Sequence, residues 1–117
     1  VEGLFLSSNE SLENVEGLRA LETVDERLVV DDCDLLVELE GFRNLESIGG
    51  ELILRDSDAL LSLDGFRGVT TFRGSLRVFN NSLLPACEVE DLAERFRGLG
   101  WDGEYENEYN NEGGLCE

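Results

Sequence analysis

The chain has 117 residues, the usual size of a single domain, and 41% of them are hydrophobic. Its 27 Asp and Glu residues outweigh nine basic residues, all of them Arg, and leave a net charge of −18. This charge excludes nucleic acid and anionic lipid as partners, because both bind basic surfaces. The lack of His removes histidine acid–base chemistry and the commonest zinc ligand. No apolar run approaches the roughly 18 residues of a membrane span, so we expect no membrane insertion.

The acidic surface is open to several interpretations. Its field attracts cations such as Ca²⁺, or a basic partner. It also suits a protein that needs solubility, or one that works in salty surroundings where screening removes the repulsion between like charges.

Four segments of the chain align without gaps at a spacing of 24 residues, and they begin at Glu2, Glu26, Gly50 and Gly74. The third and fifth positions of each segment are aliphatic, which is the alternation of a half-buried strand. Those positions hold Leu4, Leu28, Leu52 and Leu76, followed by Leu6, Val30, Leu54 and Val78. A later position holds Gly17, Gly41 and Gly65. There the chain either turns with a positive φ or passes close to its neighbour.

A single repeat of this kind cannot bury its aliphatic residues. Stacked repeats can, because each aliphatic position becomes an internal ladder. The sequence therefore predicts a β-solenoid of about four 24-residue rungs. We expect one domain over 1–117, with the repeats in 1–87 and a C-terminal cap in 88–117. The first rung has no capping sequence before it, so we expect its edge to contact another domain or a second copy.

The motif G-x-L-x-[ILV]-x-x-N-x-x-L-x-x-[LV]-x-G-[LF]-x-x-[LV], with the tail NNSLLPACEVEDLAERFRGLGW, resembles the receptor L-domain type of leucine-rich repeat. That type occurs in growth-factor receptor ectodomains and in secreted bacterial surface proteins and lipoproteins. The resemblance implies a leucine-rich-repeat-like, right-handed β-helix that binds a ligand. The chain departs from the family in its few rungs and its missing N-terminal cap. It also keeps the motif's Asn only at Asn9 and Asn81, with Cys33 and Ser57 between them.

The C-terminal tail predicts a helix. Val89, Leu92, Phe96 and Leu99 follow one another at intervals of three, four and three residues, which places them on one helix face. We expect this capping helix to cover the last rung, with Trp101 sealing its edge. Residues 103–107 then resemble a degenerate fifth strand.

The three cysteines fit different roles. Cys87 and Cys116 bracket the cap, so we predict a disulfide between them, which would place the protein outside the cytoplasm. The alternative is a pair of thiols in a reducing compartment. For Cys33 we expect a small buried side chain in the turn after its strand. A reactive thiol or an intermolecular disulfide are the alternatives for Cys33.

Aspartates that follow two of the predicted strands are candidate metal ligands, namely Asp32, Asp34, Asp56 and Asp58. Turns rich in oxygen suit Ca²⁺, which takes six to eight oxygen ligands. The spacing does not match an EF-hand loop, and solvated turns balanced by counter-ions are the alternative. We expect no other cofactor.

The strand alternation turns Phe5, Val29, Ile53 and Arg77 away from the ladder core. An exposed apolar stripe of this kind marks an interaction face, although it also forms under a neighbouring domain or from β-propensity alone. Without histidine triads, phosphate loops or a cleft, we expect no enzyme. The sequence predicts a secreted or surface module that recognises a protein or glycan through this face. The alternative is an assembly element that stacks on a neighbouring domain or on itself. A calcium-stabilised version of either is a further alternative.

Overall fold

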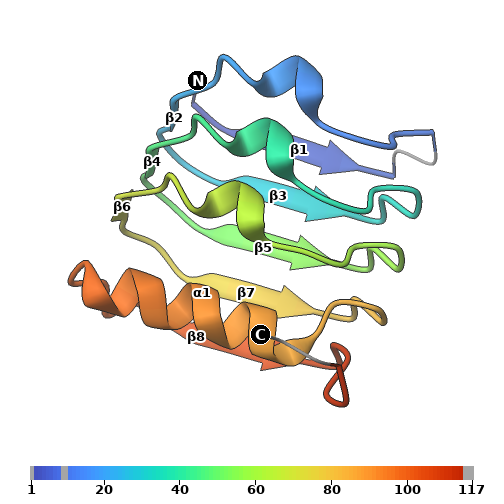
Figure 1. Ribbon diagram of the computed structural model, residues 1–117. Helices are drawn as coiled ribbons and strands as arrows, with labels where there is room; N and C mark the ends of the chain where they lie inside the picture. Colours follow the sequence, from blue (N-terminus) through green and yellow to red (C-terminus); the bar gives the residue numbers. More distant parts are fainter. Residues whose placement is uncertain (1, 9–10, 115–117) are drawn as a thin grey trace.

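Two parallel sheets and one α-helix form the computed structural model, which describes residues 2–8 and 11–114 (Figure 1). The larger sheet has the strand order β1 (Leu4–Ser7), β3 (Leu28–Asp31), β5 (Leu52–Arg55), β7 (Leu76–Phe79) and β8 (Tyr105–Glu108). The smaller sheet has the order β2 (Thr23–Val24), β4 (Ser47–Ile48) and β6 (Thr71–Phe72). The remaining elements are the 3₁₀ helices η1 (Glu16–Leu18), η2 (Glu40–Phe42) and η3 (Asp64–Phe66), and α1 (Ala86–Gly98).

Successive strands of the larger sheet pair in a register of 24 residues, the spacing of the sequence repeat. Leu4 pairs with Leu28, Leu28 with Leu52, and Leu52 with Leu76. The next pair, Leu76 with Tyr105, spans 29 residues because α1 lies between β7 and β8. We refer to residues 2–25, 26–49 and 50–73 as layers 1, 2 and 3, and to residues 74–85 with α1 as layer 4.

The predicted fold class is wrong. The sequence predicted a β-solenoid, a leucine-rich-repeat-like right-handed β-helix of about four rungs, whereas the chain is a small α/β domain with two separate parallel sheets and extents of 28 × 28 × 22 Å. The strands of the smaller sheet are two residues long, and the third side of layers 1 to 3 is a 3₁₀ turn instead of a strand. Repeated apolar positions require only that neighbouring segments lie in register, and open parallel sheets satisfy this as well as a closed coil.

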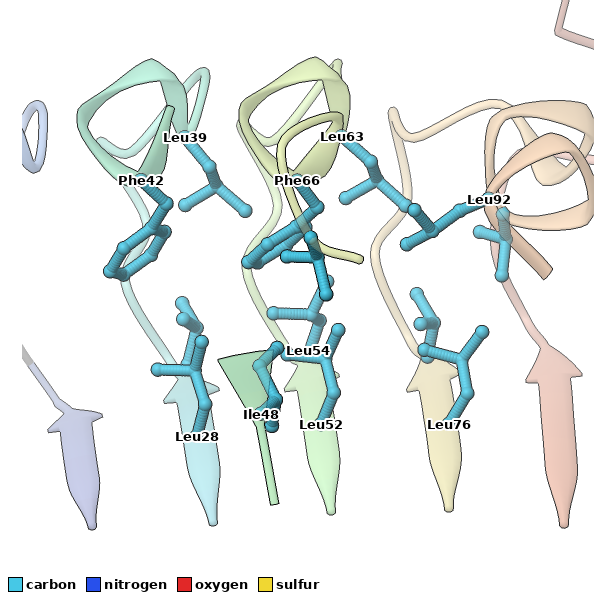
Figure 2. Packing of buried hydrophobic residues seen from close by; sticks show 14 of the residues in the cluster. Leu28, Leu39, Phe42, Ile48, Leu52, Leu54, Leu63, Phe66, Leu76 and Leu92 are labelled. Carbon is cyan, nitrogen blue, oxygen red and sulfur yellow. The ribbon is translucent and has the colours of Figure 1, made fainter. Parts of the chain in front are cut away.

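The hydrophobic core lies between the larger sheet and the 3₁₀ turns. Leu28, Leu52 and Leu76 are fully buried on the inner side of successive strands. Phe42 and Phe66 stack above them with ring centroids 5.6 Å apart and ring planes 13° apart (Figure 2). Burying one Leu or Phe completely contributes on the order of 2 kcal/mol, so this repeated row is the main stabilising feature.

In layer 4, α1 takes the place of the 3₁₀ turn. Leu92 continues the row formed by Leu39 and Leu63 (Figure 2). Leu99 was expected on the same buried face, but it is 51% exposed because the helix ends before it, at Gly98. No helix in the described residues is long and apolar enough to cross a membrane.

Polar groups fix α1 to layer 3. The Leu63 amide donates to the Glu88 carboxylate at 3.1 Å. Arg95 in turn donates to the Phe66 carbonyl oxygen at 3.1 Å and also to that of Arg67. Side chains of α1 therefore bond three backbone groups of layer 3 and hold the helix against it.

Trp101 packs against layer 4 and is 8% exposed. Its indole nitrogen donates to the Gly74 carbonyl oxygen at 2.8 Å. Its ring lies 5.4 Å from that of Phe72 and 6.0 Å from that of Phe96, between centroids. This end of the two sheets is thus closed by aromatic packing as well as by α1 and β8.

Candidate functional site

The outer row of the larger sheet contains the four residues proposed from the sequence as a binding face. Phe5 pairs with Val29, Val29 with Ile53, and Ile53 with Arg77, so the register brings all four into one line. Phe5 is 58% exposed, but Val29 and Ile53 are only 4% and 8% exposed. The expectation of a continuous exposed stripe is therefore wrong for its two middle residues.

Ion pairs flank these two middle residues on the same face. Arg27 pairs with Glu51 at 2.9 Å on one side, and Arg55 pairs with Asp31 at 3.3 Å on the other. Each pair joins residues in or directly before β3 and β5, two positions away from the apolar row. Arginine side chains commonly lay their aliphatic stems along apolar surface while their charged ends stay in water.

Arg77 ends the apolar row and is surrounded by carboxylates. It lies 3.1 Å from Glu51, 3.6 Å from Glu106 and 3.8 Å from Glu104. Each exposed pair is worth little alone, but one arginine shared by three carboxylates joins β5, β7 and the β8 segment. Arg77 therefore serves the sheet first, and a ligand that used it would have to displace these carboxylates.

The candidate metal ligands lie in the turns that follow β3 and β5. Asp32 and Asp56 have φ values of 56° and 54°, and the matching Ser8 and Asn80 have 53° and 58°. Asp and Asn tolerate this left-handed conformation better than most residues, which gives the two aspartates a backbone role. Their recurrence at one repeat position therefore follows from the shape of the turn.

The remaining acidic turn residues do not converge on one point. Asp34 and Asp58 are exposed, and the Asp58 carboxylate accepts a hydrogen bond from the Ser82 hydroxyl at 3.3 Å. Within residues 2–8 and 11–114, no three Cys, Asp or Glu side chains are grouped to hold a metal ion. Calcium at Asp32, Asp34, Asp56 and Asp58 thus stays a prediction of the sequence.

The cysteines are only partly within the described residues. Cys116 lies outside them, so its pairing with Cys87 stays a prediction. The Cys87 sulfur lies 3.8 Å from the carbonyl oxygen of Gly114. Cys33 is fully buried, as expected, and its thiol donates to the carbonyl oxygens of Leu6 and Asp31 at 3.5 and 3.6 Å.

One end of the two sheets is not covered by any of the residues that the structure describes. β1 is the edge strand of the larger sheet, and β2 is that of the smaller sheet (Figure 1). Five leucines of layer 1 pack on the core but stay partly exposed, namely Leu4, Leu6, Leu12, Leu18 and Leu21. Their counterparts in layer 2 are all fully buried, namely Leu28, Val30, Leu36, Phe42 and Leu45. We call the outer side of layer 1 the open end.

A second apolar surface was missed by the sequence reasoning. Leu35, Val37, Leu61 and Leu83 are between 42% and 51% exposed in the turns after β3, β5 and β7. We call these four residues the turn ridge. Leu35 and Leu83 share one repeat position, and Val37 and Leu61 share another. Apolar residues that recur outside the strand and core positions were the signal that could have revealed them.

Tyr105 of β8 and Glu90 of α1 form a close contact between titratable groups. The tyrosine hydroxyl donates to the Glu90 carboxylate at 2.6 Å. Burial, followed by this hydrogen bond, raises the pKa of Tyr105 well above its ordinary value. A group that holds its proton so firmly is poorly suited to proton transfer near neutral pH. The contact is therefore structural and joins α1 to β8.

No protein-family model, curated protein or solved structure matches this chain. The resemblance to receptor L-domains therefore rests on the sequence motif alone.

The outer face of the larger sheet is largely occupied by its own ion pairs, and Phe5 is the one large apolar side chain described in its strands that is exposed. The open end and the turn ridge offer apolar groups that the described residues do not cover.

Proposed function

We propose that this chain is a non-enzymatic extracellular binding module, and that its open end takes up a β-strand from a second polypeptide chain. The observation that carries the proposal is the contrast between layers 1 and 2. Leu6 and Leu12 are partly exposed, whereas Val30 and Leu36, which occupy the same repeat positions, are fully buried. Covering them with another layer would remove apolar surface from water, which drives association.

The backbone of β1 has amides oriented to form hydrogen bonds with such an added strand. The amides of Leu4 and Ser8 donate to the carbonyl oxygens of Arg27 and Asp31, on the β3 side. Because successive amides of a strand point to opposite sides, the amides of Phe5 and Ser7 face away from β3. An added strand would receive these hydrogen bonds and extend the sheet, as in other cases of peptide recognition by strand addition.

The side chains around β1 indicate what the added strand contains. A hollow of about 330 Å³ beside β1 is lined by Glu2, Gly3, Phe5, Glu26 and Arg27, so both acidic and apolar groups lie next to the added strand. Exposed acidic residues of layer 1, including Glu13 and Glu22, surround the apolar leucines. The complementary strand therefore alternates apolar and basic residues.

A short peptide of alternating Val and Lys is the probe, and fluorescence anisotropy measures its binding to the 117-residue chain. Ser7→Pro removes the outward amide of β1 without touching the amides that bond to β3. Ser7→Ala is the matched control, because it removes the hydroxyl but keeps the amide. We expect Ser7→Pro to weaken binding by at least about tenfold and Ser7→Ala to change it by less than about twofold.

The strand can come from another protein or from a second copy of this chain. Sedimentation of the unliganded chain distinguishes the two, because a second copy would give a dimer that Ser7→Pro abolishes. Equal peptide binding by Ser7→Pro and the parent chain would overturn the proposal. The proposal would also be overturned if the peptide does not bind and the unliganded chain is monomeric. Circular dichroism of each variant confirms that the fold is retained.

A further inference from the structure

The turn ridge has a regular spacing. The Leu61 amide donates to the Val37 carbonyl oxygen at 2.8 Å, which places these two ridge residues in adjacent turns. Neighbouring strands lie about 4.8 Å apart, so Leu35 and Leu83, two layers apart, are separated by roughly 10 Å. In an α-helix, residues seven positions apart are separated by about 10.5 Å along the axis. A helix lying along the stacked turns would thus meet one layer with each of its own turns.

The chemistry around the ridge has one sign of charge. Residues 32–38, 56–62 and 80–86 contain no basic residue and five acidic ones, namely Asp32, Asp34, Glu38, Asp56 and Asp58. Among the described residues, no ion pair uses Asp34, Glu38 or Asp58. On the outer sheet face, by contrast, Asp31 and Glu51 are held by arginines. The ridge is therefore an apolar strip bordered by carboxylates that remain available to a cationic partner.

We propose that the turn ridge binds a basic amphipathic helix of a partner protein. The apolar face of that helix contacts the four ridge residues, and its Lys and Arg side chains pair with Asp34, Glu38 and Asp58. The helix-in-groove mode uses the same spacing of apolar anchors, at i, i+3, i+4 and i+7. A strongly acidic protein repels its own copies, which favours a basic partner over self-association at this surface.

A synthetic helical peptide tests the proposal, with Leu at i, i+3, i+4 and i+7 on one face and Lys on the other. A scrambled peptide of the same composition measures the binding that charge alone provides. The double variant Leu35→Ser/Leu83→Ser removes the two ends of the ridge. Leu99→Ser is the matched control, because Leu99 is 51% exposed, as is Leu35, but lies beyond the end of α1.

We expect the helical peptide to bind the parent chain at least about tenfold more tightly than the scrambled peptide does. The double variant should lose this preference, whereas Leu99→Ser should keep it. The proposal is overturned if both peptides bind equally, or if the double variant binds the helical peptide as well as the parent chain does. Ser7→Pro should leave this binding unchanged, so the outcome is independent of strand addition at the open end.

Discussion

Gly65 lies directly against the backbone of Leu39 in the preceding layer, so a β-carbon at Gly65 would overlap the Leu39 carbonyl group. Gly41 has the same relation to Val15, one layer earlier. Neither glycine has a positive φ. Among the glycines of the described residues, only Gly100 has one. Of the two explanations that the sequence left open for this position, close approach is thus the correct one.

The first prediction concerns these glycines. Gly65→Ala should lower the free energy of unfolding by about 2–3 kcal/mol, because the methyl group forces layers 2 and 3 apart. Gly17→Ala is the matched control, since Gly17 holds the same repeat position but has nothing within 4 Å. Its effect should stay within about 0.5 kcal/mol. Urea unfolding of both variants measures the difference, and equal effects would contradict the close-approach explanation.

Gly65 and Gly17 also show how far the sequence determined the fold. The 24-residue repeat indicated which residues pair, and Leu28, Leu52 and Leu76 do lie beside one another. It did not indicate how each layer closes, because a 3₁₀ turn and a strand bury the same apolar positions. The local sequence around Gly65 is compatible with both, and only contacts between layers decide between them.

The candidate site was less predictable, and Val29 shows why. A period of two assigns Val29 to the outer face, and the assignment is correct. Whether that face is exposed to solvent depends on the ion pairs Arg27–Glu51 and Arg55–Asp31, which join neighbouring layers. Leu35 is the opposite case, an aliphatic residue in a polar turn whose exposure no strand or helix period describes. Side-chain cover between layers is a property of three-dimensional contacts, which a single sequence does not encode locally.

The second prediction concerns a buried amide ladder. Asn81 accepts a hydrogen bond from the Ser57 amide at 3.0 Å, and Asn110 accepts one from the Asn81 amide at 3.2 Å. The Asn81 side chain also donates to the Leu54 carbonyl oxygen at 3.0 Å. Asn81→Ala should therefore cost about 2–3 kcal/mol, because buried backbone groups lose their partners.

Two further variants control this experiment. Asn44→Ala removes one exposed hydrogen bond to the Arg19 carbonyl oxygen and should cost less than about 1 kcal/mol. Asn81→Ser should recover part of the loss, because Ser57 fills the same role one layer earlier, where its hydroxyl accepts from the Cys33 amide. Thermal and urea unfolding give the comparison, and a loss at Asn44 as large as at Asn81 would contradict it.

The third prediction is the pH dependence of stability. Burial and the hydrogen bond to Glu90 raise the pKa of Tyr105 in the folded chain above its ordinary value of 10.0. Above that pH the folded state holds a proton that the unfolded state has lost, so stability present below about pH 10 falls as the pH rises. Unfolding curves between neutral and alkaline pH should show this fall in the parent chain. Tyr105→Phe should flatten it, whereas Tyr109→Phe, at a residue 73% exposed, should not.

The fourth prediction concerns the disulfide expected between Cys87 and Cys116. Reductant should lower the melting temperature of the parent chain, and the loss should correspond to about 3–4 kcal/mol for a loop of this size. Cys87→Ser should melt at the reduced temperature with or without reductant. Cys33→Ala should retain the response, because Cys33 belongs to the buried turn after β3. If reductant changes nothing in the parent chain, the pairing prediction is wrong.

The last prediction separates calcium binding from general screening. A chain with a net charge of −18 repels itself, so added NaCl should raise its melting temperature. The positive φ of Asp32 and Asp56 already explains their recurrence without an ion, so calcium should add little beyond this effect. Melting in CaCl₂ is therefore compared with melting in MgCl₂ of equal concentration, since Mg²⁺ demands a stricter octahedral geometry. Equal melting temperatures are expected. A selective rise in calcium that Asp34→Asn/Asp58→Asn abolishes would instead establish the acidic turns as a calcium site, because only a ligand of the folded state stabilises it.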